Sequence, residues 1–184
     1  MRRIAVIGAG MAGLVCARTL ADRGGAVTVF DKGRGIGGRM ATRRTAEGWT
    51  FDHGAPAVHG VAPDLAARLA GAAAEGGLAG LPGMSGLLAP LAAGLDLRCG
   101  VEVGPVERAG GGWRVGAEEF AAVVVAVPAP QAAQLCAAAP RLVEAARAAR
   151  MTPCWTLLAA WDAPGGGVVA PAAAPFARIV DQDA

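Results

Sequence analysis

The sequence has no tyrosine, a single lysine at Lys32, and only four phenylalanines and four tryptophans. Its formal net charge of +2 at pH 7 is too small to indicate a nucleic-acid partner, because phosphate-driven binding needs a concentrated basic face. Charged residues make up 17% of the chain and apolar residues 54%, which is typical of a globular protein. The 184 residues suffice for one domain, or one domain and part of another.

Cysteine and histidine are too sparse to suggest a metal site or a disulfide framework. The four cysteines include no C-x-x-C pair, and we expect them to be reduced in a cytoplasmic protein. The two histidines, His53 and His59, lie six residues apart, which is not a metal-ligand pattern. The sequence also shows no Ser–His–Asp or Cys–His arrangement for nucleophilic catalysis. The four cysteines are Cys16, Cys99, Cys136 and Cys154.

Long apolar runs are also lacking. No segment reaches the ~18 residues of a membrane helix without a proline or a charge, so we predict no membrane partner. The two arginines before the apolar run 4–7 leave a secretory signal as an alternative. Gly8, Gly10 and Gly13 interrupt that run, and a signal peptide has no need of such spacing.

What the sequence does contain is a strand–turn–helix–strand pattern within its first 31 residues. Residues 4–7 form a continuous apolar run, as a buried parallel strand requires. A glycine turn follows, then an amphipathic helix over 11–23 and a second apolar strand over 26–30. This order predicts a βαβ unit and an α/β fold.

The rest of the chain mixes short strands and helices. We expect a β-meander in the middle, with a Gly110–Gly112 hairpin turn, and we expect 120–127 to be a central strand of the sheet. Pro140 should break the helical stretch over 131–149. The other expected elements are a short strand and turn at 49–55, helices over 64–74 and 87–95, a loop over 76–86, and strands over 96–103, 105–108, 112–115 and 155–161.

The glycines of the turn form the pattern G-x-G-x-x-G over residues 8–13. This pattern alone is weak evidence, but here it follows a buried strand and opens a helix. Gly8 permits a tight turn, Gly10 lets a pyrophosphate approach the backbone, and Gly13 lets the helix pack close to the sheet. The free N–H groups at the helix start, those of Met11 and Ala12 included, would then bind the phosphates.

Asp31 follows the second strand, 18 residues after Gly13. A carboxylate at this place can accept hydrogen bonds from the ribose hydroxyls of an adenosine. It should also repel a 2′-phosphate, which disfavours NADP in this pocket. The alternative without a nucleotide site is a solvated aspartate beside an ordinary glycine turn.

Two further segments resemble the renalase-like branch of the flavin amine oxidase superfamily. These are D-K-G-R-G-I-G-G-R-M at 31–40 and F-D-H-G-A at 51–55. The resemblance implies a Rossmann-like FAD-binding domain of the glutathione-reductase type, with a G-G-R segment along the FAD pyrophosphate. It places Lys32, Gly38, Arg39 and Met40 at the cofactor, with Arg39 facing phosphate, and brings His53, Gly54 and Ala55 near the flavin ring.

The resemblance continues more loosely. Val103 resembles a residue that contacts adenine through its backbone, and Val127 ends a strand that returns beneath the cofactor. The resemblance implies an FAD-binding domain over 1–150, with a shortened insertion around 60–82. Residues 151–184 would begin a substrate domain that is incomplete, because the superfamily's C-terminal G-D segment has no match after residue 163.

These observations predict an FAD-dependent oxidoreductase that acts on a small molecule. The resemblance implies an amine or a reduced nicotinamide-type compound as hydride donor and O₂ as the reoxidant, with the flavin carrying the chemistry. His53 is a candidate residue of the flavin pocket. Two alternatives stay open: a non-catalytic dinucleotide-binding module, and an NAD-dependent dehydrogenase, against which the G-G-R segment argues.

Overall fold

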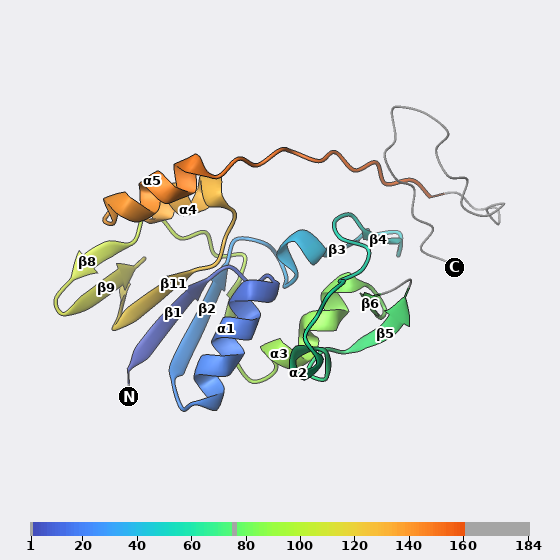
Figure 1. The fold of residues 1–184 in the computed structure, drawn as a ribbon, viewed down its shortest axis with the longest axis horizontal. Coiled ribbons are helices and arrows are strands. Elements are labelled where there is room, and N and C mark those ends of the chain that lie inside the picture. Colours follow the sequence, from blue (N-terminus) through green and yellow to red (C-terminus); the bar gives the residue numbers. More distant parts are fainter. Residues whose placement is uncertain (1, 75–76, 161–184) are drawn as a thin grey trace.

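A four-stranded parallel sheet forms the centre of the molecule. The computed structural model describes residues 2–74 and 77–160. The sheet has the order β11-β1-β2-β7, and every neighbouring pair is parallel. Figure 1 shows β11, β1 and β2 side by side. Its strands are β1 (Arg3–Ile7), β2 (Ala26–Asp31), β7 (Asp96–Cys99) and β11 (Ala122–Val125).

Alternate residues of β1 build the two faces of this sheet. Val6 packs in a cluster with Leu14 and Ala17 of α1 (Met11–Asp22). Ala5 and Ile7 face the other way and join a second cluster. Because both faces of β1 are covered, an unbroken apolar run is what this position requires.

A three-stranded antiparallel meander contributes to the second cluster. It has the order β10-β9-β8, with β8 (Glu107–Ala109), β9 (Gly112–Val115) and β10 (Glu118–Phe120). The Phe120 ring meets Phe30 of β2 edge-on, with 5.9 Å between the ring centroids. Glu118 accepts hydrogen bonds from Arg3 and Arg98, which lie on two strands of the parallel sheet. The meander is thereby joined to the sheet by both packing and charge.

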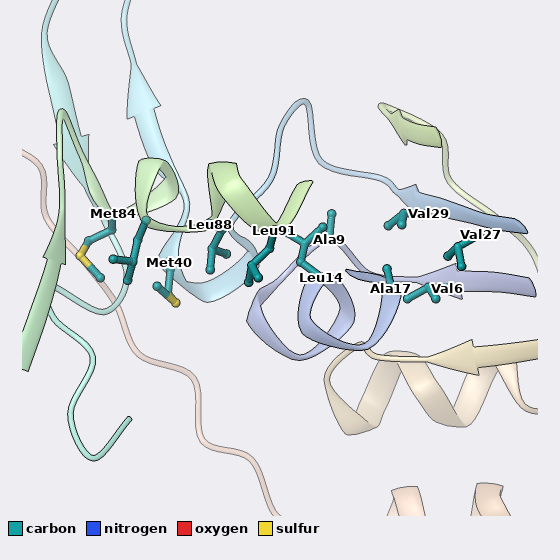
Figure 2. Packing of buried hydrophobic residues seen from close by; sticks show 11 residues of the cluster. Val6, Ala9, Leu14, Ala17, Val27, Val29, Met40, Met84, Leu88 and Leu91 are labelled. Carbon is teal, nitrogen blue, oxygen red and sulfur yellow. The ribbon is translucent and has the colours of Figure 1, made fainter. Parts of the chain in front are cut away.

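The first cluster extends well beyond the βαβ unit. Figure 2 shows a row of apolar side chains from Val27 and Val6, past Leu14, to Leu91 and Met84. Met40 lies in this row, so the segment after β2 is anchored in the same core. The elements between β2 and β7 are η1 (Gly38–Met40), β3 (Thr42–Arg44), β4 (Thr50–Asp52), α2 (Pro63–Ala66), β5 (Gly71–Ala74), β6 (Gly77–Gly80), η2 (Met84–Leu88) and α3 (Ala89–Ala92).

Much of the expected pattern is confirmed. The βαβ unit, the meander with its turn after Ala109, the short strand β4 and the α/β fold all agree with the sequence prediction. Proline separates α4 (Ala129–Leu135) from α5 (Pro140–Ala148) as expected.

Several local expectations are wrong. The helix expected over 64–74 ends after one turn in α2, and β5 occupies its last residues. β5 pairs with β6, which lies where a loop was expected. The strand expected over 96–103 ends at Cys99.

The strand expected over 120–127 is divided between two sheets: Phe120 ends β10 of the meander, and β11 covers Ala122–Val125. β11 lies at an edge of the parallel sheet and not at its centre, because within the described residues it pairs with β1 alone. Residues 155–160 form no regular strand, and Trp155 is almost fully exposed; the tail from 161 lies outside the described residues.

Candidate dinucleotide site

The glycine turn lies at the carboxyl ends of β1 and β2. The Gly8 N–H donates to the carbonyl of Phe30 at 2.8 Å, so the turn begins with its backbone attached to the neighbouring strand. The chain then enters α1, whose N-cap is Gly10. Ligands of open α/β sheets bind at this edge, outside the carboxyl ends of the strands.

The structure requires glycine at two of the three glycine positions of the turn. Gly8 has φ +112°, a conformation that side-chain-bearing residues rarely adopt. A Cβ on Gly13 would lie 1.8 Å from the Gly8 carbonyl oxygen, so helix and strand approach too closely for any side chain. Gly10 has φ −80° and ψ −178°, and a Cβ there would meet no heavy atom nearer than 3.8 Å. The fold itself therefore does not require glycine at position 10.

The N-terminus of α1 presents backbone donors. No side chain caps it, and its first turn contains no acidic residue. The first intrahelical bond runs from the Leu14 N–H to the Gly10 carbonyl at 2.9 Å. The amides of Met11, Ala12 and Gly13 precede that bond, and such groups together with the helix dipole favour an anion.

Asp31 ends β2 beside the turn. Its Oδ2 accepts the Ala9 N–H at 2.6 Å, and its Oδ1 accepts the Gly33 N–H at 2.6 Å. Each oxygen of a carboxylate can accept more than one hydrogen bond, so acceptor capacity for ribose hydroxyls is left. The sequence predicted the place of Asp31 but gave no sign of its two backbone partners.

The glycine-rich segment after β2 packs directly against the turn. The Gly37 N–H donates to the Ala9 carbonyl at 2.9 Å, and a Cβ on Gly38 would lie 3.2 Å from the Gly10 Cα. Arg39 is exposed, whereas the Met40 side chain is buried in the first cluster. The structure thus brings the two predicted glycine segments together, and the Met40 side chain packs in the core.

The D-H-G-A turn is attached to the same segment. The Arg39 carbonyl accepts the Ala55 N–H at 2.9 Å, and a Cβ on Gly54 would lie 2.0 Å from that carbonyl oxygen. The His53 carbonyl accepts a hydrogen bond from the Thr156 hydroxyl at 3.0 Å. Residues 53–55 are therefore held next to the glycine segment. The hydrogen bond from Thr156 could not be predicted from the sequence.

Other predicted site residues lie at more varied places. Lys32 is exposed. Val103 and Val127 are half-buried and pack against the second cluster, which fits a structural role as well as a backbone contact with a ligand. Asp52, which precedes the predicted residues 53–55, accepts hydrogen bonds from the Thr42 hydroxyl at 2.6 Å and the Met84 N–H at 3.0 Å. Asp52 thus joins β4 to β3 and η2.

Charge around the site is asymmetric. Five cations between residues 32 and 44 are all exposed, and that stretch contains no acidic residue. They are Lys32, Arg34, Arg39, Arg43 and Arg44.

Cys99 lies opposite Asp31 in the β2–β7 register. Burial raises the pKa of its thiol, and the nearby Asp31 charge raises it further.

The described residues hold no group of three or more His, Cys, Asp or Glu side chains that could bind a metal ion. Within the same part of the chain, no helix is long and apolar enough to cross a lipid bilayer.

The fold and the glycine turn define a Rossmann-like domain. Residues 6–71 match the family model described as an NAD(P)-binding Rossmann-like domain. A 4,4′-diapophytoene desaturase from Staphylococcus aureus is 48% identical over 56 residues, which are 30% of this chain and 11% of that protein. The chain thus spans about a tenth of the length of this curated relative.

Solved structures share the fold over a longer stretch. An oxidoreductase from Methanosarcina mazei superposes with a TM-score of 0.55 at 15% identity, over 79% of this chain and 65% of that one. A putative protoporphyrinogen oxidase from Exiguobacterium gives 0.57 at 14% identity, over 78% and 64%. A putrescine oxidase gives 0.50 at 16% identity, over 70% and 58%. At these identities the likeness establishes the α/β Rossmann-like fold.

Proposed function

We propose that this chain binds FAD and is the nucleotide-binding part of a flavin-dependent oxidoreductase. The observation that carries the proposal is the open space at Gly10. Gly8 and Gly13 are needed for the fold, whereas the backbone angles and surroundings of Gly10 would accept a side chain. An absent side chain at the N-terminus of a helix leaves room for a phosphate to reach the backbone amides.

The residues around Gly10 fit the ADP half of the cofactor. The amides of Met11, Ala12 and Gly13 would bind the pyrophosphate, together with the neighbouring Gly38 backbone. Arg39 would add a charge-assisted hydrogen bond from its exposed side chain. Asp31 would accept the ribose hydroxyls and disfavour a 2′-phosphate, and the backbone of Val103 would contact the adenine.

Two observations favour FAD over NAD, and a third supports a redox cofactor in general. The glycine-rich segment 37–40 packs on the turn, where it would extend the phosphate site. Residues 53–55 are held by that segment through the Arg39 carbonyl, and there they would contact the part of a longer cofactor that extends beyond its pyrophosphate. The matched desaturase and the putrescine oxidase carry the names of oxidoreductases, which agrees with a redox cofactor here.

The flavin, when bound, would supply hydride acceptance. The chain's own part is to bind and orient it. The Arg39 carbonyl fixes Gly54 and Ala55, and Thr156 fixes the backbone of His53, so these residues would form one wall of the flavin pocket. We propose an amine or a reduced nicotinamide-type compound as hydride donor and O₂ as reoxidant, as in the renalase-like branch. Residues 1–150 would form the FAD-binding domain, and residues from 151 would enter a substrate domain.

A second candidate is a nucleotide-binding module without turnover. The side-chain and backbone groups that the described residues bring together concern the ADP half of the cofactor, which favours this alternative. Both candidates bind ADP, and only the first retains the isoalloxazine ring.

Absorption spectra of the purified protein distinguish the two candidates. We expect flavin bands that persist through gel filtration, and titration calorimetry with FAD, ADP and NAD⁺ should rank FAD first. A colourless protein that binds ADP and FAD equally would favour the module, and preference for NAD⁺ would refute the flavin assignment.

Gly10→Ala tests the placement of the phosphates. The methyl group fits the fold but occupies the phosphate position, so we expect FAD affinity to fall at least about tenfold, the equivalent of one charge-assisted hydrogen bond. Gly111→Ala is the matched control, because it adds a methyl into equally open space at the β8–β9 turn. Unchanged FAD affinity in Gly10→Ala would overturn the proposed site.

A further inference from the structure

Asp31 has two donors before any ligand arrives. Its Oδ2 accepts the N–H of Ala9, within the glycine turn, and its Oδ1 accepts the N–H of Gly33, in the loop after β2. Both bonds are 2.6 Å long, as charge-assisted bonds are. We propose that Asp31 is a positioning residue, whose carboxylate holds the phosphate-binding turn in shape independently of any contact with ribose.

The same short segment connects three strand ends. The Asp31 carbonyl accepts the Val101 N–H at 2.9 Å, and the Gly33 carbonyl accepts the Gly100 N–H at 2.7 Å. Residues 100 and 101 follow β7, whereas Ala9 follows β1. Residues 31–33 therefore tie the loops after β1, β2 and β7 together at the edge where the nucleotide is proposed to bind.

Burial makes the Ala9 bond important. Ala9 is fully buried, and the Asp31 carboxylate is the acceptor that the structure gives its N–H. A buried donor without a partner is strongly unfavourable, and the turn would have to open or shift to hydrate it. The neighbouring amides of Met11 and Ala12 would then lose the alignment that phosphate binding needs.

This inference rests on the proposed nucleotide site. It differs from a ribose-binding role alone in whether the loss of Asp31 weakens or strengthens the binding of a diphosphate that has no ribose hydroxyls. Removing an anion beside a phosphate site should strengthen phosphate binding by relieving repulsion. A ribose contact adds a loss only for ligands that have ribose hydroxyls. A positioning role predicts weaker binding of every diphosphate, including one that lacks those hydroxyls.

The experiment compares ADP with 2′,3′-dideoxy-ADP on the full chain by titration calorimetry. For Asp31→Ala we expect the affinity for dideoxy-ADP to fall at least about fivefold, and that for ADP to fall further. Asp31→Asn keeps one acceptor oxygen and should give an intermediate loss, and it serves if Asp31→Ala does not fold. Unchanged or tighter dideoxy-ADP binding in a folded Asp31 variant would overturn the positioning role.

Hydrogen exchange provides a readout that needs no ligand. Asp31→Asn replaces one of the two acceptor oxygens by an NH₂ group, so we expect at least one of the Ala9 and Gly33 amides to exchange at least about tenfold faster, as the loss of a charge-assisted bond predicts. Glu102→Gln is the matched control, because it removes an exposed carboxylate from the loop after β7. Unchanged exchange at both amides would refute the inference. Absence of ADP and FAD binding in the wild type would instead refute the proposed function, while the exchange measurement would still test the role of Asp31 in the turn.

Discussion

Gly13 should behave in the opposite way to most helix glycines. Replacing an interior helix glycine by alanine ordinarily stabilises a helix by about 1 kcal/mol. At Gly13 the new Cβ would lie 1.8 Å from the Gly8 carbonyl oxygen and 3.0 Å from its carbon. Both are backbone atoms of the turn, so no side chain can rotate away to make room.

The size of the effect follows from this distance. To restore a 3.0 Å contact, α1 must move from β1 by at least about 1.2 Å, the difference between 3.0 and 1.8 Å. Such a shift would disturb Leu14 and Ala17, which are fully buried against the sheet. Overpacking of this kind costs about 1–3 kcal/mol or more, which exceeds the gain in helix propensity. We therefore expect Gly13→Ala to lower the unfolding free energy by about 2 kcal/mol.

Urea unfolding followed by circular dichroism measures this difference, and a melting temperature lower by roughly 4–8 °C should accompany it. Ala12→Gly is the control, because Ala12 is the exposed neighbour on the same helix and its loss of a methyl should cost about 1 kcal/mol through propensity alone. A Gly13→Ala protein as stable as the wild type, or more so, would show that helix and strand do not approach as closely as described.

Three further predictions concern the core, acid stability and cysteine reactivity. Leu88→Ala, at a fully buried position, should lower the unfolding free energy by about 2–5 kcal/mol in urea titrations, whereas Leu142→Ala, at an exposed one, should change it by less than about 0.5 kcal/mol. Hydrogen bonds from two arginines lower the pKa of Glu118 below its usual 4.5. The stability that this carboxylate contributes is therefore present above pH 4.5 and is lost as the pH falls through the lowered pKa. In thermal melts from pH 7 to 3, the melting temperature of Glu118→Gln should fall less steeply with acid than that of the wild type. Burial raises the pKa of Cys99, so iodoacetamide followed by mass spectrometry should find exposed Cys154 alkylated first, and equal rates would contradict the described burial.

The sequence alone predicted the βαβ unit and the place of the site. An apolar run, a glycine turn and an amphipathic helix are local patterns, and each depends on residues that are neighbours along the chain. The position of Asp31 after the second strand follows from the same local order. For this reason the fold class and the candidate residues from Gly8 to Asp31 could be named before the structure, whereas Gly38 and Arg39 were candidates only through the family resemblance.

Only the tertiary structure decided which strands are neighbours and which glycine has room for a side chain. The apolar pattern of β11 is the same at an edge or in the centre of a sheet, because partners distant in sequence determine that choice. The segment 64–80 is rich in alanine and glycine, a composition compatible with helix or strand, so the pairing of β5 with β6 selected the strand. The open space at Gly10 and the two donors to Asp31 likewise arise from approaches between separate segments, which no local pattern records.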